Sequence, residues 1–313
     1  MATVLCVVGP TATGKTKMGV ALAKRFNGEV VSVDSMQIYR GMAVGTAAPT
    51  AEEMEGIPHH MVAVADPAES WSAARYVQAA DACVQDILRR GKLPVLVGGT
   101  GLYLDALIRG TDFAAGSQGT EIRQELQRRA RNEGIETLLE ELRRIDPIAA
   151  EKLHLRDEKR IIRALEVWQE TGRTITEHDR LERQQPPKYD ALYIGLDFID
   201  RQDLRDRIDC RVDIMVEQGL LAEVKALLDS GLPRDATALQ AIGYKQFLAV
   251  AESTATTEEA IAEVKLRSRQ YAKRQLTWLR RNPDIHWILW GEEPNFPRGL
   301  QNATEYLTAL GLR

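Results

Sequence analysis

Short apolar runs alternate with helical patterns through the N-terminal third of the chain. Valine-rich runs at 4–8, 29–33 and 93–97 have the length and composition of strands buried on both faces. Amphipathic helical patterns occupy 15–26 and 70–90, and each ends at a turn that contains glycine. This alternation predicts right-handed crossovers and a parallel sheet covered by helices, with ligands bound beyond the carboxyl ends of the strands.

The middle of the chain has a different pattern. Residues 113–192 are rich in charge, helical in pattern and without a convincing buried strand, whereas 191–198 (ALYIGLDF) and 286–290 again suggest strands. We therefore predict an α/β fold with a parallel sheet flanked by helices, in which residues 1–112 and 193–313 form the core domain. An inserted all-helical domain is expected over residues 113–192.

Composition narrows the class of protein. The chain has 313 residues, of which 44% are hydrophobic, enough for a large core, and its net charge is only -4. A general attraction to nucleic acid is therefore not indicated, and any such surface must be local. The cysteines at 6, 83 and 210 are far apart, so each is expected to be a small buried hydrophobe. No apolar run is long enough to span a membrane and no basic leader is evident, which favours a cytoplasmic protein.

Residues 9–16 read GPTATGKT and match the phosphate-binding P-loop pattern, with the preceding strand and following helix that the motif requires. Gly9 and Gly14 let the backbone turn so that its N–H groups and the helix N-terminus converge on phosphate oxygens. Lys15 adds positive charge, and the Thr16 hydroxyl is a candidate magnesium ligand. The alternative is a tight strand-to-helix turn that binds nothing.

The residues that follow the next two strands help to identify the ligand whose phosphates the P-loop would bind. ATPases generally need an acid at the end of a hydrophobic strand, but the run at 93–97 continues into GGTG, which disfavours a motor-type ATPase. Asp34 follows the second strand, where it could act as a base or only cap a turn beside Ser35. Thr100 lies at the same sheet edge, although its loop could be only a turn and helix start.

Two segments are locally basic. Residues 265–281 (KLRSRQYAKRQLTWLRR) contain seven basic residues and no acid, and Arg267, Arg274 and Arg281 recur at helical spacing. They could form a track for phosphates, with aromatic rings available for bases, or be ordinary solvated side chains. Residues 156–168 repeat the pattern, so two basic helices predict a clamp. The adjacent His59 and His60 would point to opposite faces of a strand, which favours packing over metal binding.

With these features assembled, the chain resembles the bacterial tRNA dimethylallyltransferases of the IPP transferase family over nearly its full length. The motifs that carry the resemblance occur in the family's order: GPTATGKT, DSMQIYRGM with GTA, PHH, LVGGTGLYLDAL, KRIIRALEVW with TG, QAIGYKQ and RQYAKRQLTWLR. After Gly110 the chain departs from the family, reading TDFAAGSQGTEIRQ in place of a proline-rich stretch. The C-terminal zinc finger of some eukaryotic relatives is absent from the sequence.

The resemblance implies a P-loop NTPase-like core that binds dimethylallyl diphosphate in place of ATP. The implied reaction transfers the dimethylallyl group to N6 of the adenosine immediately 3′ of the anticodon, in tRNAs that read codons beginning with U, and releases diphosphate. Mg²⁺ is the expected cofactor, the anticodon stem-loop the expected partner, and a monomer the expected state. An anticodon-loop base is already single-stranded, so moving it into a pocket costs less than extracting it from a duplex.

The resemblance also assigns roles to individual residues. Asp34 is implied to be the base, Lys15 to stabilise the leaving group, and Thr100 to lie between the diphosphate and the incoming nucleotide. The implied diphosphate ligands are Gly9, Pro10, Thr11, Ala12, Thr13, Gly14, Lys15, Thr16 and Arg211. The flipped base would be lined by Ser35, Met36 and Gln37 beside Asp34 and Thr100. Other implied tRNA contacts are Arg123, Lys159, Arg160, Ile161, Ile162, Arg163, Gln240, Ala241, Ile242, Gly243, Tyr244, Lys245, Lys273, Arg274, Gln275, Leu276, Thr277, Trp278, Leu279 and Arg280.

Two other functions are compatible with the residues alone. A P-loop small-molecule kinase could use Asp34 as a base toward an alcohol. An RNA-binding protein could use a bound nucleotide only as a switch.

Overall fold

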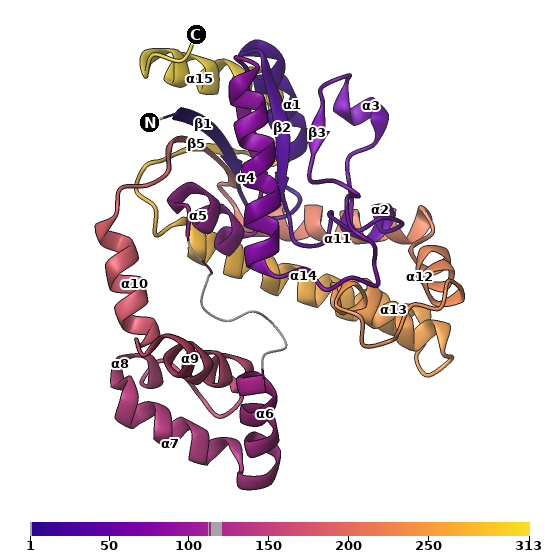
Figure 1. Cartoon of the computed structure of the whole chain (residues 1–313). Helices are drawn as coiled ribbons and strands as arrows, with labels where there is room; N and C mark the ends of the chain where they lie inside the picture. The colour runs from indigo at the N-terminus through magenta and orange to yellow at the C-terminus, as the bar shows by residue number, and fades with distance from the viewer. Residues whose placement is uncertain (1, 112, 114–120) are drawn as a thin grey trace. The chain divides into compact units, whose positions relative to one another are not determined.

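The computed structural model describes residues 2–111, 113 and 121–313. They divide into two compact units, one running up to Ile108 and resuming as Tyr189–Arg313, the other Arg109–Lys188 (Figure 1). The expected insertion was set at 113–192, but residues 189–192 belong to a strand of the first unit. Residue 112, at the other expected boundary, lies outside the described residues, as does most of the segment after Gly110 that departs from the family.

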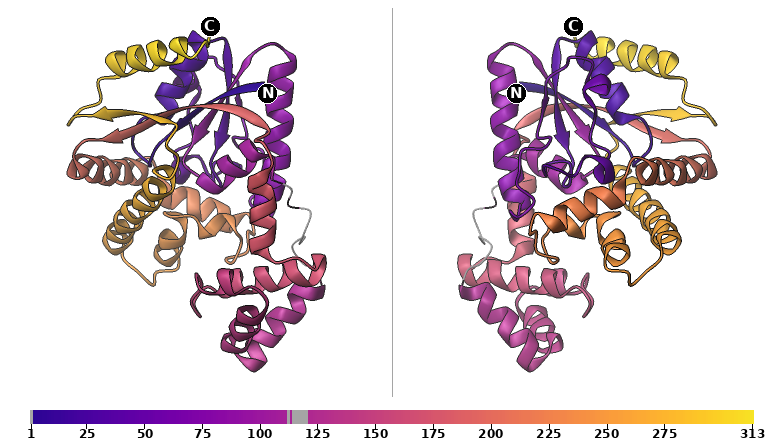
Figure 2. Two further views of the ribbon diagram at one scale, coloured as in Figure 1. Left: turned by 90° about the vertical axis from the view of Figure 1, so that its left-hand side faces the viewer. Right: turned by 90° about the vertical axis from the view of Figure 1, so that its right-hand side faces the viewer.

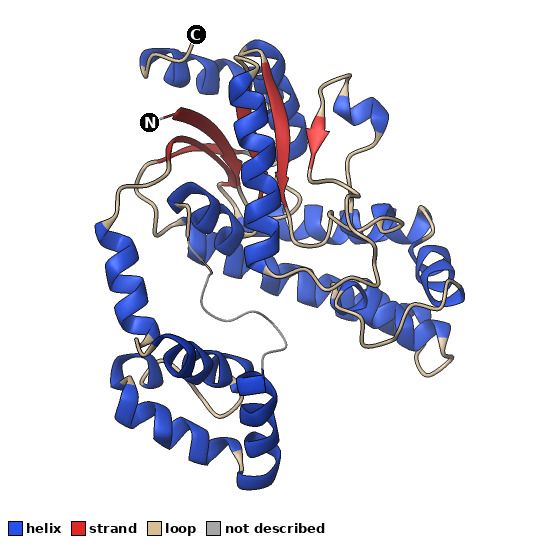
Figure 3. Cartoon of the chain, in the orientation of Figure 1, coloured by secondary structure: helices blue, strands red, loops and turns tan. Residues whose placement is uncertain are grey.

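The first unit is built on a six-stranded sheet in which every pairing is parallel, as predicted (Figure 3). The strands lie in the order β3-β2-β4-β1-β5-β6. Their bounds are β1 Ala2–Val8, β2 Gly28–Val33, β3 His59–His60, β4 Leu93–Gly98, β5 Tyr189–Phe198 and β6 Ile285–Trp290. Because all run in one direction, the loops after β1, β2 and β4 meet at one edge of the sheet.

Helices cover both faces of this sheet (Figures 1 and 2). On β1, Leu5 and Val7 share a buried cluster with Met18 and Leu22 of α1 (Lys15–Arg25), so alternate strand residues point toward that helix. The intervening residues point to the opposite face, where α4 (Ala73–Arg89) lies. Burial on both faces explains why these strands read as continuous apolar runs.

The other helices of the first unit place functional segments around the sheet edge. The short helices are α2 (Ala43–Thr46) and α3 (Ala51–Met54), and α5 (Gly101–Arg109) follows β4. After β5 come α11 (Arg201–Glu217), α12 (Leu220–Asp229), α13 (Tyr244–Ala251) and α14 (Thr257–Leu279), and α15 (Phe296–Ala309) follows β6. Thr256 and Glu259 form a capping box that begins α14, the long helix that carries the first basic segment.

The second unit is entirely helical in its described part and has its own core. Its helices are α6 (Glu121–Glu133), α7 (Ile135–Ile145), α8 (Pro147–Ala150), α9 (Glu158–Thr171) and α10 (Ile175–Gln184). Leu126, Leu138, Leu142 and Leu165 pack together in one buried cluster. A cluster of this kind can hold the four longer helices together without help from the sheet.

One histidine of the adjacent pair takes part in a network of polar contacts. The Nε2 atom of His60 lies 2.8 Å from the buried Glu29 carboxylate, which also accepts hydrogen bonds from Arg90 and Lys92. Arg90 and Lys92 supply positive charge, and the imidazole adds a further polar contact, to a carboxylate that would otherwise be costly to bury. The expectation that all the cysteines are buried holds for Cys6 only, because Cys83 is half-buried and Cys210 is exposed on α11. Among the described residues, no helix has both the length and the apolar character required to cross a bilayer.

Candidate active site

Three loops meet at the carboxyl edge of the sheet. The backbone N–H of Thr100 donates to the carbonyl of Val33, at 3.3 Å, so the loop after β4 touches the end of β2. At Gly99, an added Cβ would lie 3.1 Å from the carbonyl oxygen of Gly9. Gly9, Asp34 and Thr100, which the sequence placed at strand ends, are therefore brought together.

The P-loop has the backbone geometry of an anion-binding turn. Ala12 has a positive φ of 67° and Gly14 a φ of 83°, so the chain turns sharply before α1 begins. The Thr13 hydroxyl is buried and donates to the carbonyl of Pro10, at 2.9 Å. A side chain at position 14 would place its Cβ 2.4 Å from the ring of Phe296, so only glycine fits there. The loop is thus held in one shape before any ligand arrives.

Side chains distant in sequence support the loop. Trp290 donates from its indole N–H to the carbonyl of Thr13, at 3.0 Å. Gln275 on α14 accepts from the N–H of Thr11, at 2.9 Å, and donates to the carbonyl of Gly99, at 3.1 Å. Trp290 was not expected here from the sequence, and Gln275 was assigned to tRNA. That assignment is wrong for its side chain, which is buried between two loops of the site.

Two poorly solvated cations lie at this loop. Lys15 donates from Nζ to the carbonyl of Pro10, at 2.6 Å. Burial, reinforced by the positive charge of Arg211, lowers the pKa of Lys15 to about 7, and Asp34 only partly opposes this. Burial also lowers the pKa of Arg211, whose buried Nε has no hydrogen-bond partner among the described residues. Poorly compensated positive charge favours an anion here, which makes Lys15 and Arg211 candidates to bind one.

Asp34 serves as a turn cap, and this leaves one oxygen for chemistry. Its Oδ1 accepts from the N–H groups of Met36, at 2.8 Å, and Gln37, at 3.2 Å. Its Oδ2 makes no hydrogen bond within the described chain. The two alternatives raised by the sequence, a cap and a base, are therefore compatible. Asp34 also lies near Lys15 and Arg211 and contributes to the pKa of each.

Gln37 is held at both ends of its amide. Its Oε1 accepts from the Ser32 hydroxyl, at 2.9 Å, and its Nε2 donates to the carbonyls of Thr46 and Ala47. The amide is therefore already hydrogen-bonded within the protein, which holds the side chain in place. Gln37 is half-buried, as are Ser35 and Met36, and the contact of these residues with a flipped base stays a prediction.

Aromatic residues close the site around Asp34. Burial is the main cause that raises the pKa of Tyr103 to about 12 and of Tyr271 to about 12, and the charge of Asp34 adds to both. Thr100 lies near Tyr271, yet its buried Oγ1 has no hydrogen bond of normal geometry among the described residues. An unpartnered hydroxyl beside Asp34 is available to a substrate. Tyr103 was not among the residues expected from the sequence, although it lies in the LYLDAL motif.

The segment of α14 expected to contact tRNA contains both buried and exposed residues. Gln275, Leu276 and Leu279 are buried, so the prediction of side-chain contacts with tRNA is wrong for them. Trp278 packs its ring against Gly101, where an added Cβ would lie 2.3 Å away, and donates to Asp105 at 2.9 Å. The exposed members are Lys273, Arg274, Thr277 and Arg280.

The predicted track of three arginines at seven-residue spacing is also partly wrong. Arg267 pairs with Glu263 on the same helix, and Arg281 follows the end of α14. Two further basic residues of the segment pair with acids of α11. Arg274 lies over the ring of Tyr271 at 5.7 Å and pairs with no carboxylate within the described ranges. Ion pairing thus removes much of the apparent basic excess.

The segment 240–245 is mostly internal. Ala241, Gly243 and Tyr244 are buried and Ile242 is half-buried, so the side chains of Ala241 and Tyr244 are not available to tRNA. Gln240 and Lys245 are exposed. The Tyr244 hydroxyl donates to Glu223, a residue that the sequence had not indicated.

In the helical unit, some residues expected to contact tRNA are exposed and others have structural roles. Lys159 and Arg160 are exposed on α9. Ile161 and Ile162 lie in the core of the unit, so their side chains are unavailable to tRNA. Arg123 and Arg163 both pair with the fully buried Glu166, a structural role that corrects the expected tRNA contacts.

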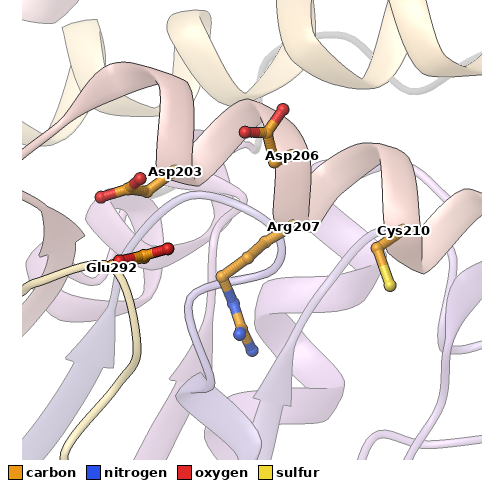
Figure 4. Close-up of a pocket in the computed structure, with 5 residues that line it drawn as sticks. All are labelled: Asp203, Asp206, Arg207, Cys210 and Glu292. Atoms are coloured by element: carbon orange, nitrogen blue, oxygen red, sulfur yellow. The ribbon is translucent and has the colours of Figure 1, made fainter.

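An open surface depression of about 280 Å³ lies beside the P-loop (Figure 4). It is lined by Asp203, Asp206, Arg207 and Cys210 of α11 together with Glu292. Arg207 reaches the carbonyl of Ala12, at 3.4 Å. Its acidic side chains repel phosphate, so the diphosphate site is better placed at Lys15 and Arg211.

Comparison with known proteins identifies the family of the chain. The model of the IPP transferase family matches residues 37–282, and that of the isopentenyl transferases matches residues 2–65. The chain belongs to the IPP transferase family.

Relatives cover almost the whole chain of this IPP transferase. It is 41% identical to the tRNA dimethylallyltransferase of Acetivibrio thermocellus over 312 residues, which cover 100% of this chain and 99% of that protein. It is 48% identical to the tRNA dimethylallyltransferase of Halalkalibacterium halodurans over 284 residues, covering 91% and 90% of the two chains.

Solved structures of the family have the same fold. The full-length tRNA isopentenylpyrophosphate transferase from Bacillus halodurans matches with a TM-score of 0.74 and 42% identity, covering 99% of this chain and 96% of that chain. A eukaryotic dimethylallyltransferase acting on tRNA matches with a TM-score of 0.82 and 30% identity, covering 99% and 79%. The predicted P-loop NTPase-like fold is confirmed for this IPP transferase.

Proposed function

We propose that this IPP transferase moves a dimethylallyl group from dimethylallyl diphosphate to N6 of the adenosine immediately 3′ of the anticodon, in tRNAs that read codons beginning with U. The observation that carries the proposal is the pair of poorly compensated cations, Lys15 and Arg211, beside the single carboxylate of Asp34. The first two suit a leaving diphosphate, and the third suits an attacking amine. The names of the relatives support this reaction over a small-molecule kinase.

The chemistry follows from these positions. The N6 lone pair attacks C1 of the dimethylallyl group while the bond from C1 to the bridging oxygen breaks, and its electrons leave on the diphosphate. Lys15, Arg211 and the P-loop amides stabilise that charge as it develops. An adenine amine is a poor nucleophile because its lone pair is delocalised, so Asp34 Oδ2 orients it and accepts the proton that the new bond displaces. The Thr100 hydroxyl can form a hydrogen bond with either substrate.

Magnesium fits the residues present. Mg²⁺ is usually held by one or two protein oxygens together with substrate phosphates and water. The Thr16 hydroxyl makes no hydrogen bond within the described chain. Among the described residues, no group of three or more acidic, histidine or cysteine side chains could hold a metal ion by itself. Thr16 would therefore hold the ion jointly with the diphosphate, whose charge the ion would help to neutralise.

The tRNA surface is proposed to consist of exposed cations and polar groups. Its members are Lys159, Arg160, Gln240, Lys245, Lys273, Arg274, Thr277 and Arg280. Charges of this kind bind phosphates without reading sequence, while the pocket near Asp34 selects the base. We further propose that the enzyme acts as a cytoplasmic monomer.

Replacing Asp34 with Asn tests the mechanism. The amide cannot accept the proton, so we expect turnover to fall by roughly two to four orders of magnitude while both substrates still bind. Nucleosides from unmodified tRNA, incubated with enzyme, magnesium and dimethylallyl diphosphate, would be weighed by mass spectrometry. The exposed Asp284→Asn is the matched control and should behave as wild type. Full turnover by Asp34→Asn would remove this carboxylate from the reaction.

A further inference from the structure

Glu223 on α12 lies outside the site yet binds a segment that leads into it. Its two carboxylate oxygens accept from the N–H of Val44, at 2.9 Å, and the N–H of Gly45, at 3.0 Å. These N–H groups open α2, whose cap residue Met42 provides no side-chain hydrogen bond. Glu223 therefore caps α2 from another helix, in a charge-assisted and bidentate manner.

Tyr244 of α13 also takes part, and we call Glu223 and Tyr244 together the α2 clamp. Tyr244 is fully buried, and its hydroxyl donates to Oε1 of Glu223. An added Cβ on Gly45 would lie 2.5 Å from the Tyr244 ring and 2.8 Å from Leu220. Glycine is thus required for α2 to approach α12 and α13 so closely.

Helix α2 also holds Gln37, which is hydrogen-bonded to Asp34. The carbonyls of Thr46 and Ala47, at the other end of α2, both accept hydrogen bonds from Nε2 of Gln37. The backbone N–H of Gln37 donates to Oδ1 of Asp34. Hydrogen bonds, joined by the backbone of α2 and by Gln37 itself, therefore connect Glu223 to Asp34, which we assign as the proton acceptor.

We propose that Glu223, assisted by Tyr244, is a positioning residue for Asp34 and acts through α2 and Gln37. This inference rests on the proposed function, because it concerns how the base is aimed at the acceptor amine. Hydrogen bonds that lock a catalytic group matter because a displacement of about 1 Å can cost on the order of a hundredfold in rate. The α2 clamp does not touch the P-loop, so the diphosphate site is expected to remain intact without it.

The test is a double-mutant cycle between Glu223→Gln and Gln37→Ala, measured as kcat at saturating tRNA and dimethylallyl diphosphate. The amide that replaces the Glu223 carboxylate can accept one N–H but opposes the other, so we expect kcat to fall by about tenfold to a hundredfold, while KM for dimethylallyl diphosphate changes less than about twofold. In the Gln37→Ala background the same change should cost less than about threefold, because the path is already broken. Asp229→Asn, exposed on the same helix, should leave kcat unchanged.

Further outcomes separate the possibilities. Tyr244→Phe keeps the ring that packs on Gly45 but loses the hydroxyl, so a smaller fall in kcat with the same coupling to Gln37 is expected even if Glu223→Gln folds poorly. Binding of inorganic pyrophosphate, measured by calorimetry, should match wild type in each variant. Additive effects of the Glu223 and Gln37 changes, or an unchanged kcat, would overturn the inference while leaving the function standing. Absence of prenyl transfer by the wild-type enzyme would instead overturn the proposed function.

Discussion

Lys15 is an ordinary P-loop lysine in sequence but an unusual one in its surroundings. Burial and the nearby Arg211 charge lower its pKa to about 7, whereas a solvated lysine stays charged far above neutral pH. The lysine is therefore partly neutral in the free enzyme at ordinary pH. A bound diphosphate would restore the charge by replacing lost solvation with a direct counter-charge.

This predicts that donor binding takes up a proton above neutral pH. A Lys15 that is neutral in the free enzyme and charged in the complex requires about one proton per site at about pH 8, and affinity should fall as the pH rises through this range. Calorimetry of pyrophosphate binding in buffers of different ionisation enthalpy measures the uptake. Lys15→Arg, which stays charged, should lose it and thereby reveal any protonation of the ligand itself. Equal uptake in both proteins would contradict the assignment to Lys15.

Among the elements, α14 carries residues of both proposed substrate sites. Its exposed cations Lys273 and Arg274 face solvent, while the buried Gln275 bonds to the loops after β1 and β4. A helix exposes neighbouring residues on different faces, so one short motif can serve two roles.

The two interpretations of Gln275, loop support and tRNA contact, give opposite expectations. Loss of its hydrogen bonds in Gln275→Leu should raise KM for dimethylallyl diphosphate by about thirtyfold, because two loop contacts of roughly 1 kcal/mol each are lost, with little change in tRNA affinity. Steady-state kinetics and a filter-binding measurement of tRNA affinity would check this. Gln270→Leu, an exposed glutamine of the same helix, serves as the control. A weakened tRNA complex with normal donor KM would instead favour direct contact.

At the scale of the whole molecule, the enzyme combines a sheet-based unit with a helical unit that has its own core. The net charge of -4 gives no general attraction to RNA, so the proposed tRNA surface relies on exposed cations. Arg123 and Arg163, which already pair with the buried Glu166, are not among them.

We therefore expect substitutions of Arg160 and Arg123 to cause different defects. Arg160→Ala removes an exposed charge, so we expect weaker tRNA binding and a salt dependence whose slope falls by about one, with dimethylallyl diphosphate affinity unchanged. Arg123→Ala removes a partner of the buried Glu166, so the helical unit should lose stability to urea. Titration of tRNA binding against salt and urea unfolding separate the two. The reverse pattern would show that Arg123 faces the RNA and Arg160 supports the fold.

The sequence by itself determined the parts of this protein that depend on neighbouring residues. The valine-rich runs at 4–8 and 93–97 predicted buried parallel strands because burial on both faces requires continuous apolar side chains. The eight residues of the P-loop predicted an anion site because all its amides come from one turn. Family motifs then supplied the substrates that the pattern alone left open.

Only the tertiary structure decided which motif residues face the site. Gln275 reaches Thr11 across 264 positions, and Trp290 reaches Thr13 across 277, so no local pattern could pair them. Ile161 and Tyr244 lie inside motifs assigned to tRNA, yet packing turns both into the core. Spacing shows which residues share a helix face, but the neighbours that bury that face are chosen by the fold.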